Sequence, residues 1–281
     1  RTVLERGCDR GDTRACSSLA PLVRDGAGGP ADAGRAAALF GKACEGGDKD
    51  ACDARAKIGE AEAVALVEQV MALDKAKRYR EIPAAAVPLI ALQEQRYGPT
   101  HPKVLDLRWQ IARVRFNVGD WRGAAEAFDV LAARLRPLPE PREPPLHDVL
   151  DFAAVAWGKS GALDRALAAA EESLALRQDM AAAVLAQAEL RKAAVLVALR
   201  RFREAGEIAR TARGRLTDAE AAAAGADEIE AGAWDAAGDG AAARAARERR
   251  VAAAERLGAA AGLVDALLDL ADAEFTVDER A

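Results

Sequence analysis

The sequence has few of the side chains from which most catalytic sites are built. Its 281 residues include two histidines, His101 and His147, and four serines, none of them in a Gly-x-Ser-x-Gly or Ser-x-x-Lys arrangement. No segment alternates apolar and polar residues for long enough to predict a strand, so no glycine-rich phosphate loop can follow one. We therefore expect no enzyme activity and no catalytic residues, and we expect no cofactor and no metal ion.

Basic charge and long apolar runs are also scarce. The net charge of −5 and the pI near 5.4 argue against nucleic acid as a partner. Charged residues interrupt every apolar run before the roughly 20 residues that a membrane helix needs, so we expect no membrane insertion. One local exception is the basic stretch at residues 191–215, which predicts either salt bridges to neighbouring acids or an acidic protein partner.

Aromatic residues make up only 4% of a chain that is 51% hydrophobic, and alanine supplies most of the difference. Alanine has the highest intrinsic helix propensity and lets helices approach closely. This composition predicts an all-α fold.

Four cysteines form a repeat. Cys8 and Cys16 lie eight positions apart, Cys44 and Cys52 do the same, and the second pair follows the first by 36 residues. A fixed period of this length indicates stacked helical units. Gly-Asp turns between the cysteines predict helix hairpins, across which a disulfide can form in each pair. Buried free thiols in a cytosolic protein are the alternative.

The segment around these cysteines resembles the cysteine-rich form of the Sel-one-like repeat, over about residues 1–60. The matching positions are Ala15, Cys16, Leu19, Asp25, Gly26, Pro30, Asp32, Ala36, Leu39, Phe40, Ala43, Cys44, Gly47, Ala51 and Cys52. The resemblance implies one disulfide per repeat. Pro21 departs from the pattern and is expected to bend or shorten its helix.

A longer period continues after the cysteines. Five turn segments align at Tyr79, Trp121, Leu163, Phe202 and Gly240, with steps of 42, 42, 39 and 38 residues. They resemble tetratricopeptide helix pairs, and residues 97–128 resemble the kinesin-light-chain form with its Gly-Pro-x-His-Pro connector. We expect two cysteine-clipped pairs in residues 1–60, about five tetratricopeptide-like pairs in residues 61–261, and a C-terminal capping helix with a tail in residues 262–281.

Together these patterns predict an all-α, right-handed α-solenoid of antiparallel helix pairs. Leu263, Leu267, Leu270 and Phe275 recur at near-helical spacing, as in a capping helix. The chain starts at Arg1 rather than Met, so we expect a processed protein or a piece of a longer one. Disulfides would place it in the periplasm or at the cell surface of a bacterium, and the cytoplasm is the alternative.

A proline-rich segment lies between Arg136 and His147, with five of the 11 prolines of the chain. Such a segment cannot be helical and favours extended polyproline geometry. We interpret it as a connector between repeats; a hinge or a docking strip for a proline-recognising partner is the alternative.

In the tetratricopeptide fold the first helix of each pair lines the concave groove. The resemblance therefore places a partner-binding site on two such helices, counted back from Gly119 and Gly161: Asp106, Trp109, Gln110, Arg113, Phe116 and Asn117, then Asp148, Asp151, Phe152, Val155 and Lys159. Aromatic residues and arginines are typical of interface anchors. The alternative is that Trp109 and Phe116 pack between helices.

The kinesin-light-chain pattern has asparagine at the positions of Trp109 and Gln110. The absence of asparagine at these two positions favours a bulkier or more apolar ligand than an extended peptide backbone. The sequence predicts a non-enzymatic interaction scaffold that binds a protein or peptide in the groove, within a larger bacterial protein or envelope assembly. A binder of small molecules or cell-wall fragments is the second hypothesis, and an enzyme of unfamiliar type is the third.

Overall fold

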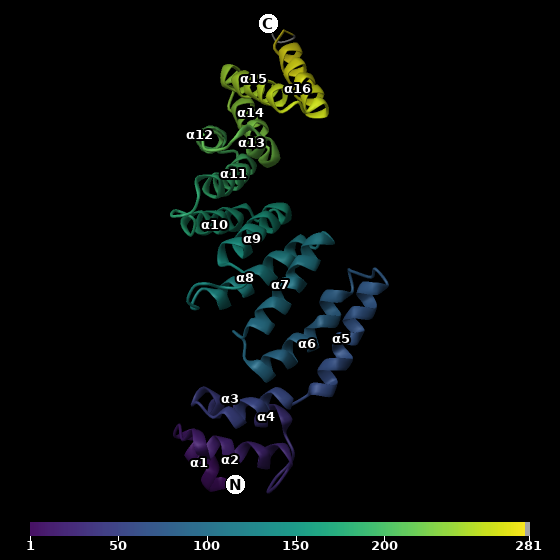
Figure 1. The fold of residues 1–281 in the computed structure, drawn as a ribbon, viewed down its shortest axis with the longest axis vertical. Coiled ribbons are helices and arrows are strands. Elements are labelled where there is room, and N and C mark those ends of the chain that lie inside the picture. The colour runs from purple at the N-terminus through teal and green to yellow at the C-terminus, as the bar shows by residue number, and fades with distance from the viewer. Residues whose placement is uncertain (279–281) are drawn as a thin grey trace. The chain divides into compact units, whose positions relative to one another are not determined.

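The computed structural model describes the backbone of residues 1–278, and their side chains except at 61, 260, 261 and 272–278. These residues form sixteen α-helices and no strand (Figure 1). The helices are α1 (Thr2–Asp9), α2 (Thr13–Arg24), α3 (Ala33–Glu45), α4 (Lys49–Lys57), α5 (Glu60–Lys75), α6 (Ile82–Tyr97), α7 (Pro102–Asn117), α8 (Trp121–Leu135), α9 (Leu146–Ser160), α10 (Leu163–Ala175), α11 (Ala182–Ala198), α12 (Phe202–Arg213), α13 (Asp218–Ala224), α14 (Ala226–Ala236), α15 (Gly240–Leu257) and α16 (Ala260–Asp278).

The chain divides into two compact units, Arg1–Pro145 with α1 to α8 and Leu146–Ala281 with α9 to α16. Within each unit, a helix packs mainly against its neighbours along the chain, as in repeat proteins. The prediction of an all-α fold built from consecutive helix pairs, as in an α-solenoid, is confirmed. The proline-rich segment contains no helix and lies where the first unit ends.

The same turn joins the two helices of seven pairs in the described chain, and it recurs between α15 and α16. Its central residue has a positive φ at Gly11, Gly47, Lys77, Gly119, Gly161, Arg200 and Gly238 in the seven pairs, and at Gly258 before α16. At each turn this residue donates its N–H to the carbonyl three positions back, and the next residue donates to the carbonyl five positions back. These two bonds define the Schellman motif, which satisfies free carbonyls at a helix end.

The interval between the turns of the seven pairs varies from 30 residues, between Gly47 and Lys77, to 42 residues, as between Lys77 and Gly119. Lys77 and Arg200 adopt the left-handed conformation without being glycine, at a cost of roughly 1 kcal/mol each. The hydrogen bonds of the motif offset that cost.

Four of the five residues aligned in the longer period are the first residues of helices: Trp121 in α8, Leu163 in α10, Phe202 in α12 and Gly240 in α15. Tyr79 differs, because α6 begins three residues later at Ile82. Pro83 follows directly, and proline fits a helix best in its first turn.

Disulfides join Cys8 to Cys16 and Cys44 to Cys52, with Cα separations of 4.7 and 4.8 Å. The capping expected at the two turns is present. Asp12 accepts from the N–H groups at the start of α2, and Asp48 accepts from the N–H of Ala51 in α4. In the second turn Gly47, and not Gly46, has the positive φ.

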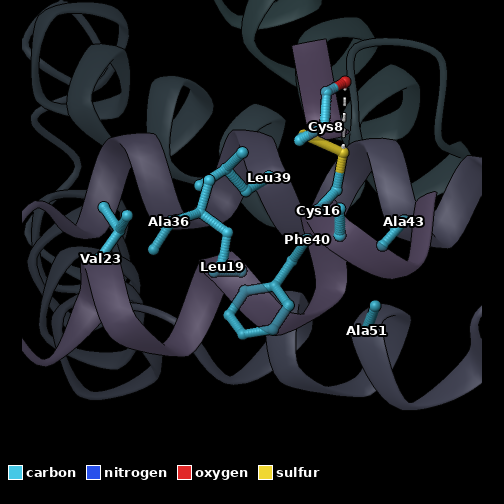
Figure 2. Packing of buried hydrophobic residues seen from close by; sticks show 11 residues of the cluster. Cys8, Cys16, Leu19, Val23, Ala36, Leu39, Phe40, Ala43 and Ala51 are labelled. Atoms are coloured by element: carbon cyan, nitrogen blue, oxygen red, sulfur yellow. Dashed lines mark hydrogen bonds between the residues drawn. A yellow bond between two sulfur atoms is a disulfide. The ribbon is translucent and has the colours of Figure 1, made fainter. Parts of the chain in front are cut away.

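A small apolar core holds the first two hairpins together. Leu19, Val23 and Phe40 are buried in one cluster with Cys8 and Cys16, as Figure 2 shows. Pro21 lies inside α2, which nevertheless continues for three more residues to Arg24. The helix therefore does not end at this proline. Proline lacks a backbone N–H, so only one carbonyl in α2 loses its usual hydrogen-bond donor.

Helices of the second unit approach closely where small residues face large ones. A Cβ added to Gly206 of α12 would lie 2.5 Å from the indole ring of Trp234 in α14. Glycine at this position thus allows Trp234 to pack directly onto the α12 backbone.

The last helix, α16, packs against α15 and buries Ala266, while Leu263 and Leu270 are half-buried. Val264, Leu267 and Leu268 are exposed. The side chain of Phe275 lies outside the described residues. A terminal cap usually presents a polar outer face, and this helix presents three apolar side chains instead.

Candidate functional site

Trp109 and Phe116 lie on the side of α7 that packs against α8. The ring of Trp109 is 5.7 Å from that of Phe128, and the ring of Phe116 is 5.2 Å from Trp121 in an edge-to-face arrangement. Aromatic pairs at these distances stabilise a helix interface. Both side chains are half-buried. The structure therefore favours the alternative in which these two rings pack between helices.

The other four residues predicted on α7 form an exposed polar row: Asp106, Gln110, Arg113 and Asn117. Their spacing of three or four residues places them on one side of the helix. Gln110 donates to the Asp106 carboxylate over 3.5 Å, and the Arg113 guanidinium lies 5.7 Å from the centre of the Trp109 ring. This row offers donors and acceptors to a partner, without an apolar pocket.

On α9 the predicted residues divide into two groups. Val155 and Lys159 are exposed, and Phe152 is half-buried. Asp148 and Asp151 belong to an ion-pair network within the second unit, in which both pair with Arg177. The two acids are therefore held in place by the protein itself.

The network is centred on the Asp151 carboxylate. Its Oδ1 accepts from Ser173 Oγ at 2.6 Å, and its Oδ2 accepts from Arg177 Nη2 at 2.6 Å and Arg191 Nη2 at 2.7 Å. Arg177 is only 2% exposed, and it also donates to Asp148 over 3.3 Å. Buried charges persist only when paired and hydrogen-bonded in this way. One carboxylate thus joins α9, α10 and α11.

Arg191 also borders a hollow of about 390 Å³ between α11, α13 and α14. Leu190, Ala224 and Ile229 supply its apolar lining, and Gln187 and Glu220 lie at its edge with Arg191. The hollow lies in the second unit alone. An apolar surface with a few fixed polar groups is the usual composition of a ligand site.

No protein-family model and no curated protein matches this chain. Among solved structures, it is similar to the crystal structure of BtubC (BKLC) from P. vanneervenii. The identity is 19%, the TM-score is 0.47, and the similarity covers 76% of this chain and 89% of that one.

Ser173 and Arg177 were not predicted from the sequence, although they complete the network. Both lie in or next to α10, the second helix of its pair, whereas the tetratricopeptide resemblance places the groove on the first helices. The available signal was the pairing of an arginine and a serine four residues apart in an alanine-rich helix.

Most of the basic stretch at 191–215 forms ion pairs within the unit. Arg210 donates to Glu230, whose side chain is fully buried, and Arg213 donates to Asp227 and Asp218. Of the two interpretations of this stretch, salt bridges to neighbouring acids is therefore the one that applies to these residues.

The two histidines have structural positions. His101 Nδ1 accepts from the N–H of Lys103 and caps α7. Burial, followed by the charges of Lys103 and Arg55, lowers the pKa of His101, which favours the neutral ring that can accept this bond. His147 lies in the first turn of α9, where its Nδ1 is 3.0 Å from the Asp148 carboxylate.

Within the described residues, no group of three or more His, Cys, Asp or Glu side chains is arranged to hold a metal ion. No helix in that part of the chain is both long enough and apolar enough to cross a bilayer.

Proposed function

We propose that this chain is a protein-interaction scaffold whose second unit binds a segment of a partner protein at the hollow beside Arg191. The observation that supports it most is the position of Arg191. Asp151 holds its guanidinium, which stays one-third exposed at the edge of an apolar hollow. Preorganised polar groups beside an apolar pocket favour tight and specific binding.

The chemistry of the hollow defines the partner segment. Leu190, Ala224 and Ile229 suit an aliphatic or aromatic side chain. The Gln187 amide and the Arg191 guanidinium supply hydrogen-bond donors for the backbone carbonyls or the carboxylate that flanks it. The partner segment thus carries an apolar anchor residue next to hydrogen-bond acceptors.

A displayed library of random peptides tests this proposal. Ala194 borders the hollow, and Ala194→Trp fills it with a large ring. Peptides selected on the native chain should bind this variant at least tenfold more weakly. Ala168→Trp is the matched control, because Ala168 is exposed on α10 away from the hollow. The proposal fails if no peptide is enriched, or if both tryptophan variants bind equally well.

A binder of small molecules or cell-wall fragments is the second candidate. A volume of about 390 Å³ lies within the range of small-molecule sites, roughly 300 to 1,000 Å³. Muropeptide fragments that raise the melting temperature of the native chain, but not that of Ala194→Trp, would support it over a protein partner.

We also propose an oxidising compartment, the periplasm or the bacterial cell surface. Both cysteine pairs are disulfide-bonded, and disulfides persist mainly outside the cytoplasm. Cells treated with a thiol-blocking reagent before lysis should yield a chain whose cysteines react only after reduction.

A further inference from the structure

Helix α5 in the first unit has an unusual environment. Among the described helices it packs extensively against α6 alone. Ala63, Leu66, Val70 and Leu73 face this neighbour, in clusters with residues of α6 such as Leu89. The other described side chains of α5 are exposed.

That open surface is apolar along one line. Val64 is 53% exposed, Val67 is 37% exposed and Met71 is 64% exposed. These residues are three and four positions apart, so they lie on one side of the helix. Single exposed apolar residues are common, but a continuous line of them indicates an interaction surface.

Acidic residues accompany this line. Glu60 and Glu68 share its side of the helix by the same spacing, and Glu62 and Asp74 are also exposed on α5. Within the described chain, none of these four acids forms an ion pair, in contrast to the buried acids of the second unit. Lys75 is the one basic residue of α5, and it lies at the C-terminal end.

We propose that this face of α5, which we call the α5 face (Glu60, Val64, Val67, Glu68 and Met71), docks a basic amphipathic helix of a partner protein. The three apolar side chains match an apolar helix face, and the acids match lysines or arginines beside it.

The negative charge of the α5 face also argues against two other binding partners. A second copy of the chain would bring an equally acidic helix to the interface, with Glu60, Glu62, Glu68 and Asp74 against Lys75 alone, and like charges across an interface repel. An anionic lipid surface is disfavoured for the same reason. The α5 face lies in the first unit, so it does not depend on the function proposed for the hollow.

A synthetic amphipathic helix tests the proposal. The probe has leucines at helical spacing flanked by lysines, and its binding to the full chain is measured by fluorescence anisotropy. Replacing Val64, Val67 and Met71 together by serine should weaken binding at least tenfold. These side chains are exposed, so the variant should keep the helical circular dichroism of the native chain.

The matched control replaces Val3, Val130 and Met180 by serine. These are also two valines and one methionine, exposed on separate parts of the chain, and the control should bind the probe as the native chain does. Glu60→Gln with Glu68→Gln supplies a second variant, which should bind more weakly and lose much of its salt dependence.

Three results would overturn the proposal: no binding to the native chain, equal weakening in the two serine variants, or equal binding of a probe with glutamates in place of the lysines. Ala194→Trp should leave probe binding unchanged, which separates this result from the test of the hollow.

Discussion

Asp151→Ala should destabilise the second unit strongly, because it removes the carboxylate at the centre of the buried network. The change deletes the acceptor of Ser173, Arg177 and Arg191 together. Arg191 can be hydrated, since it is one-third exposed, whereas Arg177 is 2% exposed. The buried guanidinium then keeps Asp148, at 3.3 Å, the Ser173 hydroxyl and two backbone carbonyls.

The expected cost is about 3 to 5 kcal/mol, the usual result of removing one partner of a buried ion pair. Replacing both partners with apolar residues should cost far less. We expect Asp151→Leu with Arg177→Met to lie within about 2 kcal/mol of the native chain, because neither side chain then requires a charge beside it.

Hydrogen exchange measured peptide by peptide is the appropriate assay, because a chain of stacked helix pairs need not unfold in one step. Exchange in α9, α10 and α11 should accelerate in Asp151→Ala, while α1 to α4 stay unchanged. Asp164→Ala is the control, since Asp164 is an exposed acid on α10 without an ion pair in the described chain. It should shift stability by less than about 0.5 kcal/mol.

The reasoning is refuted if Asp151→Ala costs less than about 1 kcal/mol in these helices. It is equally refuted if the Asp151→Leu, Arg177→Met double variant costs as much as the two single changes added together, because coupled partners are not additive.

Two further predictions concern the first unit. The lowered pKa of His101 means that the unfolded chain binds its proton first, so stability should fall as the pH drops through the ordinary histidine pKa of about 6.5 toward the lower folded value. His101→Asn keeps a cap without this titration, so its urea midpoint should change less between pH 7.5 and pH 5; equal changes in both proteins would contradict the role of His101. Replacing Cys8 and Cys16 by alanine should destabilise the first hairpin by about 2.5 kcal/mol on the chain-entropy model, which faster exchange in α1 and α2 would report. A reductant should produce the same acceleration in α1 and α2 of the native chain, and no further acceleration in these two helices of the variant, where it can break the Cys44–Cys52 disulfide alone; unchanged exchange in α1 and α2 of the native chain would contradict the prediction.

Much of the helix-pair pattern could be predicted from the sequence, because each turn needs a residue that tolerates a positive φ. Glycine marks that position at Gly119 and Gly161. Lys77 and Arg200 occupy the same position, and neither residue type indicates it. They could be aligned only because the segments around them follow the same period.

The candidate site was harder to predict. Hydrophobic periodicity places Trp109 and Phe116 on the less polar side of α7. It does not show whether that side lines a groove or packs against α8, as it does in the structure. The hollow beside Arg191 depends on α13, a short helix outside the repeated pair. Its lining brings residues of α11 next to residues of α13 and α14, and a contact between segments this far apart leaves no local pattern in a single sequence.

The recurring turn also indicates where the length of this chain can change. The two hydrogen bonds at each turn require a fixed number of residues, so an insertion there would break both. Across the seven helix pairs, the spacing from one turn to the next ranges from 30 to 42 residues, and the segments between pairs absorb part of this difference. Added sequence, such as a tag or a reporter domain, is therefore best placed between helix pairs and kept away from the turns inside them.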